Sequence, residues 1–310
     1  MPMDLHTHEA LGLHLATPAK VNGRSNNDVL ASLNHPDDEQ YEPCPESAES
    51  ASIPAGQFYK FKNWSSSNTY PDTRRDLAVH LPAEASDTPY AIAIFNDGAA
   101  YASKKGAARV TQVLDTLHAQ REIPPTVAVF VNPGLPAETP AGSPTASYTP
   151  EATQRSLEYD ALTPVYGRFL LDEVLPFVAG ELDINLTQDP EQRTVAGISS
   201  GGIAAFSAAW FHPDEFRRVL SHCGSYTNIL GGHNYPYLVR ATPRKPIRVY
   251  LQSGEQDCTT IFGDWATANM AMAKALGYAG YDFHFEFGQG GHTLRHAGAV
   301  MADSLRWLWR

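Results

Sequence analysis

Residues 197–202 read Gly-Ile-Ser-Ser-Gly-Gly and match the pattern Gly-x-Ser-x-Gly. A β-like run at residues 194–198 leads into this stretch, and a helix of small residues is expected to follow over residues 201–210. A serine at a tight turn from strand to helix projects its hydroxyl clear of the backbone, and the flanking glycines avoid clashes of Cβ atoms. The first N–H groups of such a helix point toward negative charge that develops beside the serine. The stretch predicts that Ser199 is a nucleophile; the alternative is a glycine-rich turn with an ordinary exposed serine.

Strand-like and helix-like segments alternate on both sides of this turn. Residues 90–95 and 126–131 are continuous apolar runs, as in strands covered on both faces, whereas residues 281–287 alternate between aromatic and polar residues, as in a half-buried strand. Further strands are expected at residues 56–64, 77–81, 219–222 and 247–251, and helices at residues 110–119, 162–178, 265–276 and 301–308. This alternation predicts an α/β fold, with a mostly parallel central sheet covered by helices on both faces. Reactive groups of such sheets lie at the carboxyl ends of the strands.

The first fifty residues differ from the rest of the chain. Residues 22–50 contain many Asn, Asp, Glu and Pro residues and few large apolar ones, so they bury little surface. We therefore expect a largely irregular N-terminal arm at residues 1–52 and a catalytic domain at residues 53–310. A homo-oligomer formed through the arm is left open. Residues 134–150, rich in Pro, Gly, Ser and Thr, are expected to form a long surface loop of the kind that is often functional.

Composition excludes several kinds of partner. Twenty-three Lys and Arg against 34 Asp and Glu give a net charge of −11, which argues against a groove for nucleic acid or an anionic membrane surface. The longest apolar runs are strand-sized, far below the ~20 residues of a membrane span. Three cysteines form no closed disulfide framework, and residues 1–20 lack the pattern of a signal peptide, so we expect a cytoplasmic protein.

A nucleophilic serine needs a base, and the base needs an acid that orients it. His292 follows a glycine-rich turn at the end of the strand expected at residues 281–287, where it can reach Ser199. His296 is the second choice, as base or substrate contact. Asp257 lies in the loop after the strand expected at residues 247–251; Glu255 competes with it, and loop reach favours Asp257. The order Ser199, Asp257, His292 is the one that the α/β-hydrolase fold requires.

An oxyanion hole needs two converging N–H groups. One is expected from Ser200, directly after the nucleophile, and the other from the loop after the third strand, where Gly98 or Ala99 is the candidate. A simple Asp-Gly turn is the alternative for this loop.

Two other patterns favour a structural interpretation. Residues 4–8 contain His-Thr-His, but neither a strand that would fix these ligands nor distant partner ligands are apparent, so no metal site is expected. Cys223 ends a strand and is expected to be a small buried hydrophobic residue rather than a nucleophile.

From about residue 55 to residue 310 the chain resembles the enterochelin-esterase-like "putative esterase" branch of the α/β-hydrolases, related to siderophore, feruloyl and esterase D type esterases. The segments that carry the resemblance are residues 71–75, 96–98, 155–160, 197–202, 212–216, 263–265, 290–292 and 305–309. The resemblance implies that Ser199, Asp257 and His292 are nucleophile, acid and base.

We therefore expect a serine esterase that cleaves a carboxylic ester of the siderophore-lactone, phenolic or sugar type in two steps, without a cofactor. From placement and resemblance, the expected substrate contacts are the loop at residues 134–150 and six side chains: Asn96, Tyr101, Glu158, Tyr159, Trp265 and His296. Two alternatives remain open, namely an acyltransferase that uses the same three residues and a non-catalytic binding protein on the hydrolase fold.

Overall fold

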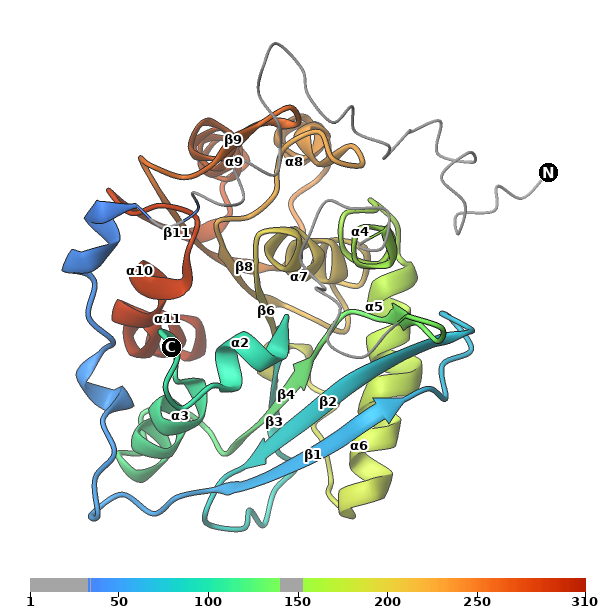
Figure 1. Ribbon diagram of the computed structural model, residues 1–310, viewed down its shortest axis with the longest axis vertical. Coiled ribbons are helices and arrows are strands. Elements are labelled where there is room, and N and C mark those ends of the chain that lie inside the picture. The colour runs from blue at the N-terminus through green and yellow to red at the C-terminus, as the bar shows by residue number, and fades with distance from the viewer. Residues whose placement is uncertain (1–32, 34, 140–152) are drawn as a thin grey trace.

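A computed structural model describes residue 33 and residues 35–139 and 153–310 (Figure 1). Within these residues nine strands form one sheet. They are β1 (Gln57–Trp64), β2 (Thr73–Leu81), β3 (Ala91–Asn96), β4 (Thr126–Val131), β5 (Leu135–Pro136), β6 (Arg193–Ile198), β7 (Arg218–His222), β8 (Arg248–Gly254) and β11 (Asp282–Gly288). Two short strands, β9 (Thr259–Thr260) and β10 (Gly263–Asp264), pair separately.

The sheet has the strand order β1-β2-β4-β3-β6-β7-β8-β11, with β5 paired to β2. Strand β2 runs antiparallel to β1, β4 and β5, and all pairs from β4 to β11 are parallel. The mostly parallel sheet and the α/β-hydrolase fold predicted from the sequence are confirmed. Because their strands are parallel, the loops after β3, β6, β7, β8 and β11 meet at one edge.

Helices cover both faces of the sheet. They are α2 (Gly98–Ala102), α3 (Val110–Ala119), α4 (Thr153–Tyr159), α5 (Val165–Phe169), α6 (Leu175–Leu182), α7 (Ser200–Phe211), α8 (Tyr235–Ala241), α9 (Trp265–Tyr278), α10 (Leu294–Ala299) and α11 (Met301–Trp309), with a π-helical turn η4 (Leu170–Val174) and 3-10 turns η5 (Pro190–Gln192) and η6 (Gly232–Asn234). Helices α5 to α9 lie on one face, and α2, α3, α10 and α11 lie on the other (Figure 1).

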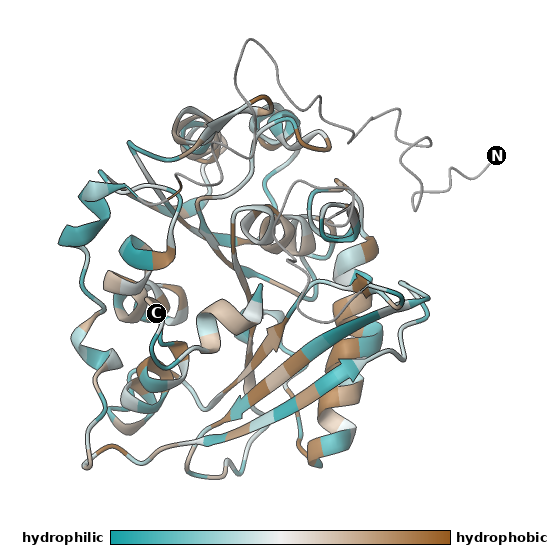
Figure 2. Cartoon of the chain, in the orientation of Figure 1, coloured by the Kyte–Doolittle hydropathy of each residue, from teal (hydrophilic) through white to brown (hydrophobic). Residues whose placement is uncertain are grey.

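Two apolar cores follow from the alternation of side chains along the strands. In β3, Ile92 and Ile94 join the core beneath α5 to α9, whereas Ala93 and Phe95 join the core beneath α3 and α11. Figure 2 shows that β2 is hydrophilic in its first half and mostly hydrophobic in its second half; over most of the strand, buried residues alternate with more exposed ones. Among the described helices, none combines the length and apolar character that crossing a membrane requires.

Sequence periodicity located most elements well. The expected helix at residues 110–119 and strand at residues 126–131 agree with α3 and β4, and Tyr166, Leu170 and Val178 share a buried face as predicted. The single long helix expected there is interrupted by the π-helical turn η4. Most of the loop expected at residues 134–150 lies outside the described residues, and its beginning forms the short strand β5.

The described part of the N-terminal arm contains two 3-10 helices, η1 (Pro36–Gln40) and η2 (Pro45–Ser47). It runs along α10, α11 and α3 (blue in Figure 1). The N–H of Cys44 donates to the carbonyl of Gly298 at 3.1 Å, and Glu46 pairs with Arg306 at 2.6 Å. These contacts dock the described arm onto its own chain.

Candidate active site

Ser199 occupies the tight turn between β6 and α7 with φ of 60° and ψ of −123°, a conformation that residues with a side chain rarely adopt. Its N–H donates to the carbonyl of His222 at 2.9 Å, and its own carbonyl accepts the N–H of Ser225 at 3.0 Å. A Cβ on Gly197 would lie 2.2 Å from the carbonyl oxygen of Gly201, so glycine is required for this close turn. Strain of this kind costs roughly 1–3 kcal/mol and is typical of functional sites.

The hydroxyl of Ser199 lies 3.3 Å from the hydroxyl of Ser225, which also accepts the indole N–H of Trp265 at 3.1 Å. The ring of Trp265 meets the imidazole of His292 edge to face, with centroids 5.9 Å apart. Among the described residues, the partner of the Ser199 hydroxyl is therefore Ser225 rather than His292. Ser199 as a whole is 9% exposed.

Asp257 and His292 follow the paired strands β8 and β11. Nδ1 of His292 lies 2.5 Å from Oδ1 of Asp257. The carboxylate also accepts the hydroxyl of Ser253 at 2.6 Å and the N–H of Cys258 at 2.8 Å. Glu255, the competing acid, is exposed. The structure thus brings Asp257, and not Glu255, to His292.

Two opposing effects act on the pKa of His292. Burial lowers its pKa. The negative charge of Asp257 and the hydrogen bond to this carboxylate raise the pKa by more than burial lowers it, so the pKa of His292 lies well above its ordinary value. The carboxylate accepts a hydrogen bond from the Nδ1–H group of His292, so Nε2 is the ring nitrogen that is available for proton transfer. The pair is thus arranged to stabilise an imidazolium.

Cys223 follows β7 and is fully buried, as predicted. Its sulfur, a nitrogen of His292 and an oxygen of Asp257 lie within 4.8 Å of one another, close enough to hold a metal ion. Burial and the nearby charge of Asp257 raise the pKa of the thiol to about 12. His292 and Asp257 already bond to each other at 2.5 Å, so two of these three groups are engaged within the pair. The His-Thr-His stretch at residues 4–8 lies outside the described residues.

The loop after β3 turns at Asp97, which has a left-handed backbone with φ of 54°. Gly98 begins α2, and a Cβ there would lie 2.5 Å from Phe130. The N–H of Ala99 donates to Oδ1 of Asn132 at 3.0 Å, so this amide already has a partner. Of the two candidate oxyanion-hole donors, the N–H of Gly98 is thus the one that does not donate to the Asn132 side chain.

Two polar contacts fix this loop against its neighbours. Arg155 holds the carboxylate of Asp97 with two hydrogen bonds, at 3.0 and 2.8 Å. The side-chain amide of Asn96 donates to the carbonyl of Gly201 at 2.9 Å and joins the end of β3 to the first turn of α7. These contacts keep the loop beside the turn that carries Ser199.

The six side chains expected to contact a substrate are buried in this structure. None is more than 4% exposed: Asn96, Tyr101, Glu158, Tyr159, Trp265 and His296. The hydroxyl of Tyr101, for example, bonds to Nδ1 of His222 at 2.8 Å, and Nδ1 of His296 bonds to the amide of Gln252 at 3.2 Å. All six are thus buried within the described residues, and their role as substrate contacts stays a prediction. Sequence placed them near the site but gave no sign of which protein groups cover them.

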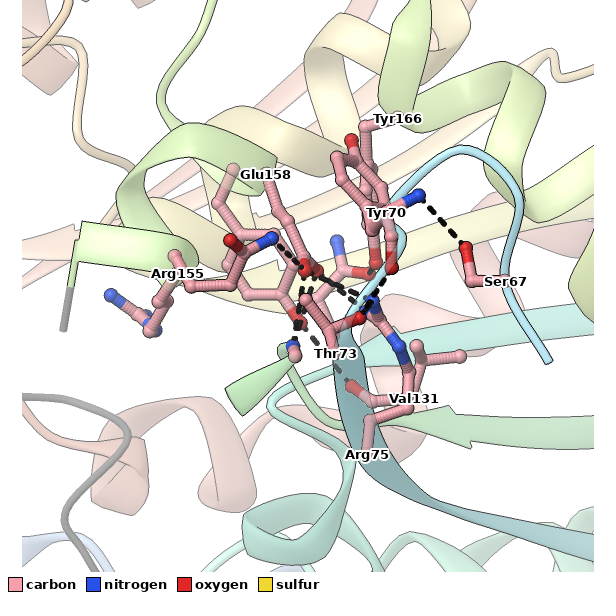
Figure 3. A network of polar contacts seen from close by, with 12 residues as sticks. Ser67, Tyr70, Thr73, Arg75, Val131, Arg155, Glu158 and Tyr166 are labelled. Carbon is pink, nitrogen blue, oxygen red and sulfur yellow. Dashed lines mark hydrogen bonds and ion pairs between the residues drawn. The ribbon is translucent and has the colours of Figure 1, made fainter. Parts of the chain in front are cut away.

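Glu158 forms a buried ion pair with Arg75 (Figure 3). Its two oxygens lie 2.6 and 2.9 Å from the guanidinium, and they also accept the N–H of Gly134 and the side-chain amide of Gln154. The guanidinium lies 4.4 Å from the ring centre of Phe169. The pair therefore joins β2, the start of the loop after β4, and α4 at the side of the site.

Breaking this pair is expected to destabilise the protein strongly. Glu158→Gln leaves the Arg75 charge buried without its counter-charge, and we expect a loss of about 3–5 kcal/mol in the free energy of unfolding. Urea denaturation measures the change. The matched control is Asp172→Asn, which removes an exposed pair with Arg168 and is expected to cost less than about 0.5 kcal/mol. Equal losses in the two variants would contradict a structural role for the buried pair.

Sequence reasoning missed three side chains of the site. Ser225 bonds to the hydroxyl of Ser199, Ser253 supports Asp257, and Arg155 holds Asp97. Their sequence neighbourhoods gave one usable signal: Ser253 lies near the end of the strand that leads to Asp257. Nothing in the sequence identifies Ser225, because its role depends on where Trp265 and Ser199 meet in space.

A cavity of about 410 Å³ lies elsewhere, lined by residues that include Pro82, Asp115 and His118. Pro82 follows β2 and Asp115 belongs to α3. Since β2 is antiparallel to β4, this cavity opens at the edge opposite the loops that carry Ser199, Asp257 and His292.

Comparison with known proteins identifies a family to which the chain belongs. A family model described as "Putative esterase" matches residues 67–308. Among curated proteins, the Iron(III) enterobactin esterase of Dickeya dadantii (strain 3937) is 31% identical over 148 residues, which are 44% of this chain and 33% of that protein. The chain thus spans about a third of the length of this relative.

Solved structures with the same fold include two esterases. An enterobactin esterase of Shigella flexneri, crystallised in the presence of 2,3-di-hydroxy-N-benzoyl-serine, has a TM-score of 0.61 and 21% identity over 86% of this chain and 61% of its own. A CE1 ferulic acid esterase of Anaeromyces mucronatus, in complex with ferulic acid, has a TM-score of 0.60 and 12% identity over 85% of this chain and 95% of its own. At these identities the similarity concerns the fold.

Proposed function

Because the chain belongs to the "Putative esterase" family, we propose that it hydrolyses carboxylic esters, with Ser199 as nucleophile, His292 as base and Asp257 as the acid that orients it. The observation that supports this most is the 2.5 Å contact of Asp257 with His292, at the same sheet edge as the strained turn of Ser199. A buried Asp–His pair with a structural role does not require a strained serine turn beside it, and a strained serine turn with a structural role does not require a nearby base. Their occurrence together favours a catalytic role.

The first step forms an acyl-enzyme. The hydroxyl of Ser199 rotates about its Cα–Cβ bond from Ser225 toward Nε2 of His292. Nε2 takes the proton while the oxygen bonds to the ester carbonyl carbon, and Asp257 stabilises the resulting imidazolium. The imidazolium then protonates the leaving alcohol as the C–O bond breaks. The second step repeats this sequence with water, which releases the acid and restores Ser199.

The oxyanion of each tetrahedral intermediate is bound by the N–H groups of Ser200 and Gly98 in this proposal. Ser200 begins a helix of 12 residues, whose first N–H groups have no partner within the helix. The N–H of Ala99 is the weaker choice because it donates to Asn132. One such donor contributes about 3 kcal/mol to transition-state stabilisation, or 10²- to 10³-fold in rate.

We propose an ester with a phenolic acid component as substrate. The ligands named with the two solved esterases, 2,3-di-hydroxy-N-benzoyl-serine and ferulic acid, both contain a phenolic ring. A phenolic ester also suits a protein with a net charge of −11 better than a strongly anionic substrate does. A panel of feruloyl, dihydroxybenzoyl-serine, acetyl-sugar and aliphatic esters distinguishes these classes by kcat/KM.

Labelling with a fluorophosphonate tests the proposal. We expect one phosphonyl adduct, which mass spectrometry of proteolytic peptides maps to Ser199, because only an activated serine displaces fluoride at a useful rate. His292→Ala should slow labelling by at least 100-fold. Absence of an adduct on Ser199 in folded protein, or equal labelling of wild type and His292→Ala, would contradict a base-activated nucleophile.

A further inference from the structure

The turn that carries His292 has little rigidity of its own. Residues 288–292 read Gly-Gln-Gly-Gly-His, and glycine backbones lose more conformational freedom on ordering than other residues do. The N–H of Thr293 donates to the carbonyl of Gly291 at 3.0 Å, and the N–H of Glu255, in the loop after β8, donates to the carbonyl of Gly288 at 2.8 Å. Catalysis nonetheless requires that the position of the imidazole vary by well under 1 Å.

The N-terminal arm supplies further support through Asp38. This side chain is 2% exposed, and its Oδ1 accepts the N–H of Gly291 at 3.0 Å and the hydroxyl of Thr293 at 3.1 Å. Its Oδ2 accepts the N–H of His35 at 2.9 Å, which fixes the carboxylate at the start of η1. Asp38 thus bonds to the residues directly before and directly after His292.

Tyr41 holds the other end of the same turn. Its hydroxyl accepts the N–H of Gln289 at 2.9 Å. Its ring stacks on His296, with centroids 4.1 Å apart and planes 14° apart. Since His296 lies in α10, directly after the turn, Tyr41 joins the beginning of the turn to the helix that follows it.

The glycines of the turn lie in close contact with residues of this arm. A Cβ on Gly288 would lie 2.2 Å from the hydroxyl oxygen of Tyr41, and one on Gly290 would lie 2.7 Å from Oδ1 of Asp38. A Cβ on Gly291 would lie 2.8 Å from the carbonyl oxygen of Leu33. Three glycines of the turn therefore allow close approach of the arm, which argues for a specific interface rather than incidental contact.

We propose that Asp38 and Tyr41 are positioning residues for His292, so that the N-terminal arm is a part of the active site. The proposal rests on the proposed function of His292 as base. The two side chains touch the turn and not the reacting atoms, and they act by keeping the imidazole between Asp257 and Ser199. Without them the turn samples arrangements in which Nε2 lies away from the serine hydroxyl.

The test compares Asp38→Ala, Asp38→Asn and Tyr41→Phe in the full chain. We expect Asp38→Ala to lower kcat by 10- to 100-fold with KM changed less than threefold, because ordering of the base affects the chemical step. Asp38→Asn keeps an acceptor oxygen for Gly291 and Thr293 and should recover most of kcat. Tyr41→Phe keeps the stacking on His296 and should lower kcat by three- to tenfold.

The matched control is Glu46→Gln, which weakens an arm contact to Arg306 away from the turn. It is expected to lower the melting temperature while kcat stays within twofold of wild type. In a His292→Ala background, Asp38→Ala should cause no further loss of kcat, because a positioning residue has no effect once the positioned group is gone.

An assay without substrate separates this inference from the proposed function. The proton on Nδ1 of His292, held by Asp257, should give a low-field proton NMR signal that Asp38→Ala broadens or shifts and Glu46→Gln does not. Failure of wild type to hydrolyse any ester would overturn the proposed function alone. Unchanged kcat and an unchanged NMR signal in folded Asp38→Ala would overturn the positioning role. A loss of kcat in Glu46→Gln equal to that in Asp38→Ala would overturn it as well. If Asp38→Ala does not fold, kcat and the NMR signal of Tyr41→Phe decide whether the arm positions His292.

Discussion

Ser199→Ala is expected to lower kcat for ester hydrolysis by roughly 10⁴- to 10⁶-fold while the protein stays folded. The oxygen that would form the covalent bond is gone, and His292 can only activate water directly. Residual activity should persist, because the oxyanion donors still stabilise the transition state. The fold should tolerate the change: among the described residues, the lost hydroxyl has one hydrogen bond, to Ser225 at 3.3 Å, which is worth about 1 kcal/mol or less. Steady-state kinetics with a phenolic ester and a thermal melt measure both quantities.

Ser207→Ala is the matched control for this substitution. Ser207 is a buried serine of the same helix, α7, whose hydroxyl bonds to that of Tyr235 at 2.6 Å. Its removal is expected to cost about 1 kcal/mol of stability and to leave kcat within twofold of wild type. If Ser199→Ala kept more than a tenth of wild-type kcat, a nucleophilic role for Ser199 would be wrong.

The fold was predictable from local patterns because each strand and helix carries its own periodicity. The continuous apolar runs that became β3 and β4 are fully buried, as expected for strands covered on both faces. Helices of one or two turns, such as α2 and α8, escaped prediction because too few residues define a period. The π-helical turn η4 depends on packing, and the apolar spacing of the sequence does not indicate it.

The site was predictable only where chain order and strand ends determine position. Asp257 and His292 follow adjacent parallel strands, so their meeting follows from topology, and their catalytic roles remain predictions. Burial was not predictable in the same way. Glu158 was expected at the pocket wall, yet its partner Arg75 lies 83 positions away in the sequence, where no local pattern connects the two.

The arm shows the same limit more clearly. Its composition predicts a segment that buries little surface, and the described residues are indeed short 3-10 turns and extended chain. Yet Asp38 bonds to a residue 253 positions later. A polar, proline-rich segment can thus become ordered through a few directed hydrogen bonds to another part of the chain, which hydrophobicity alone does not reveal.

Asp257→Asn is expected to lower kcat by about 10⁴-fold, because the amide can present its N–H₂ to Nδ1 and so favour the tautomer in which Nε2 carries the proton. Nε2 then cannot accept the proton of Ser199. The imidazolium formed during reaction also loses the charge that stabilises it. The exposed neighbour Glu255 offers the matched control, and Glu255→Gln is expected to leave kcat within twofold of wild type. The reverse outcome would assign the acid to Glu255.

The pH dependence of kcat/KM provides the second signature of Asp257. In wild type the acid limb should lie above about pH 6.5, because the pKa of His292 is raised by Asp257 despite burial, and the base must be neutral to act. Asp257→Asn removes the attraction and leaves the burial, so its residual activity should fall off at a lower pH than that of wild type. The same raised pKa makes a stabilising contribution that is fully present below the unfolded pKa of about 6.5 and is lost as the pH rises through the folded value. Substituting Asp257 should therefore cost more stability at pH 6 than at pH 9, and urea denaturation at these two pH values measures the difference. An acid limb that stays in place in Asp257→Asn would mean that another group limits the rate at low pH.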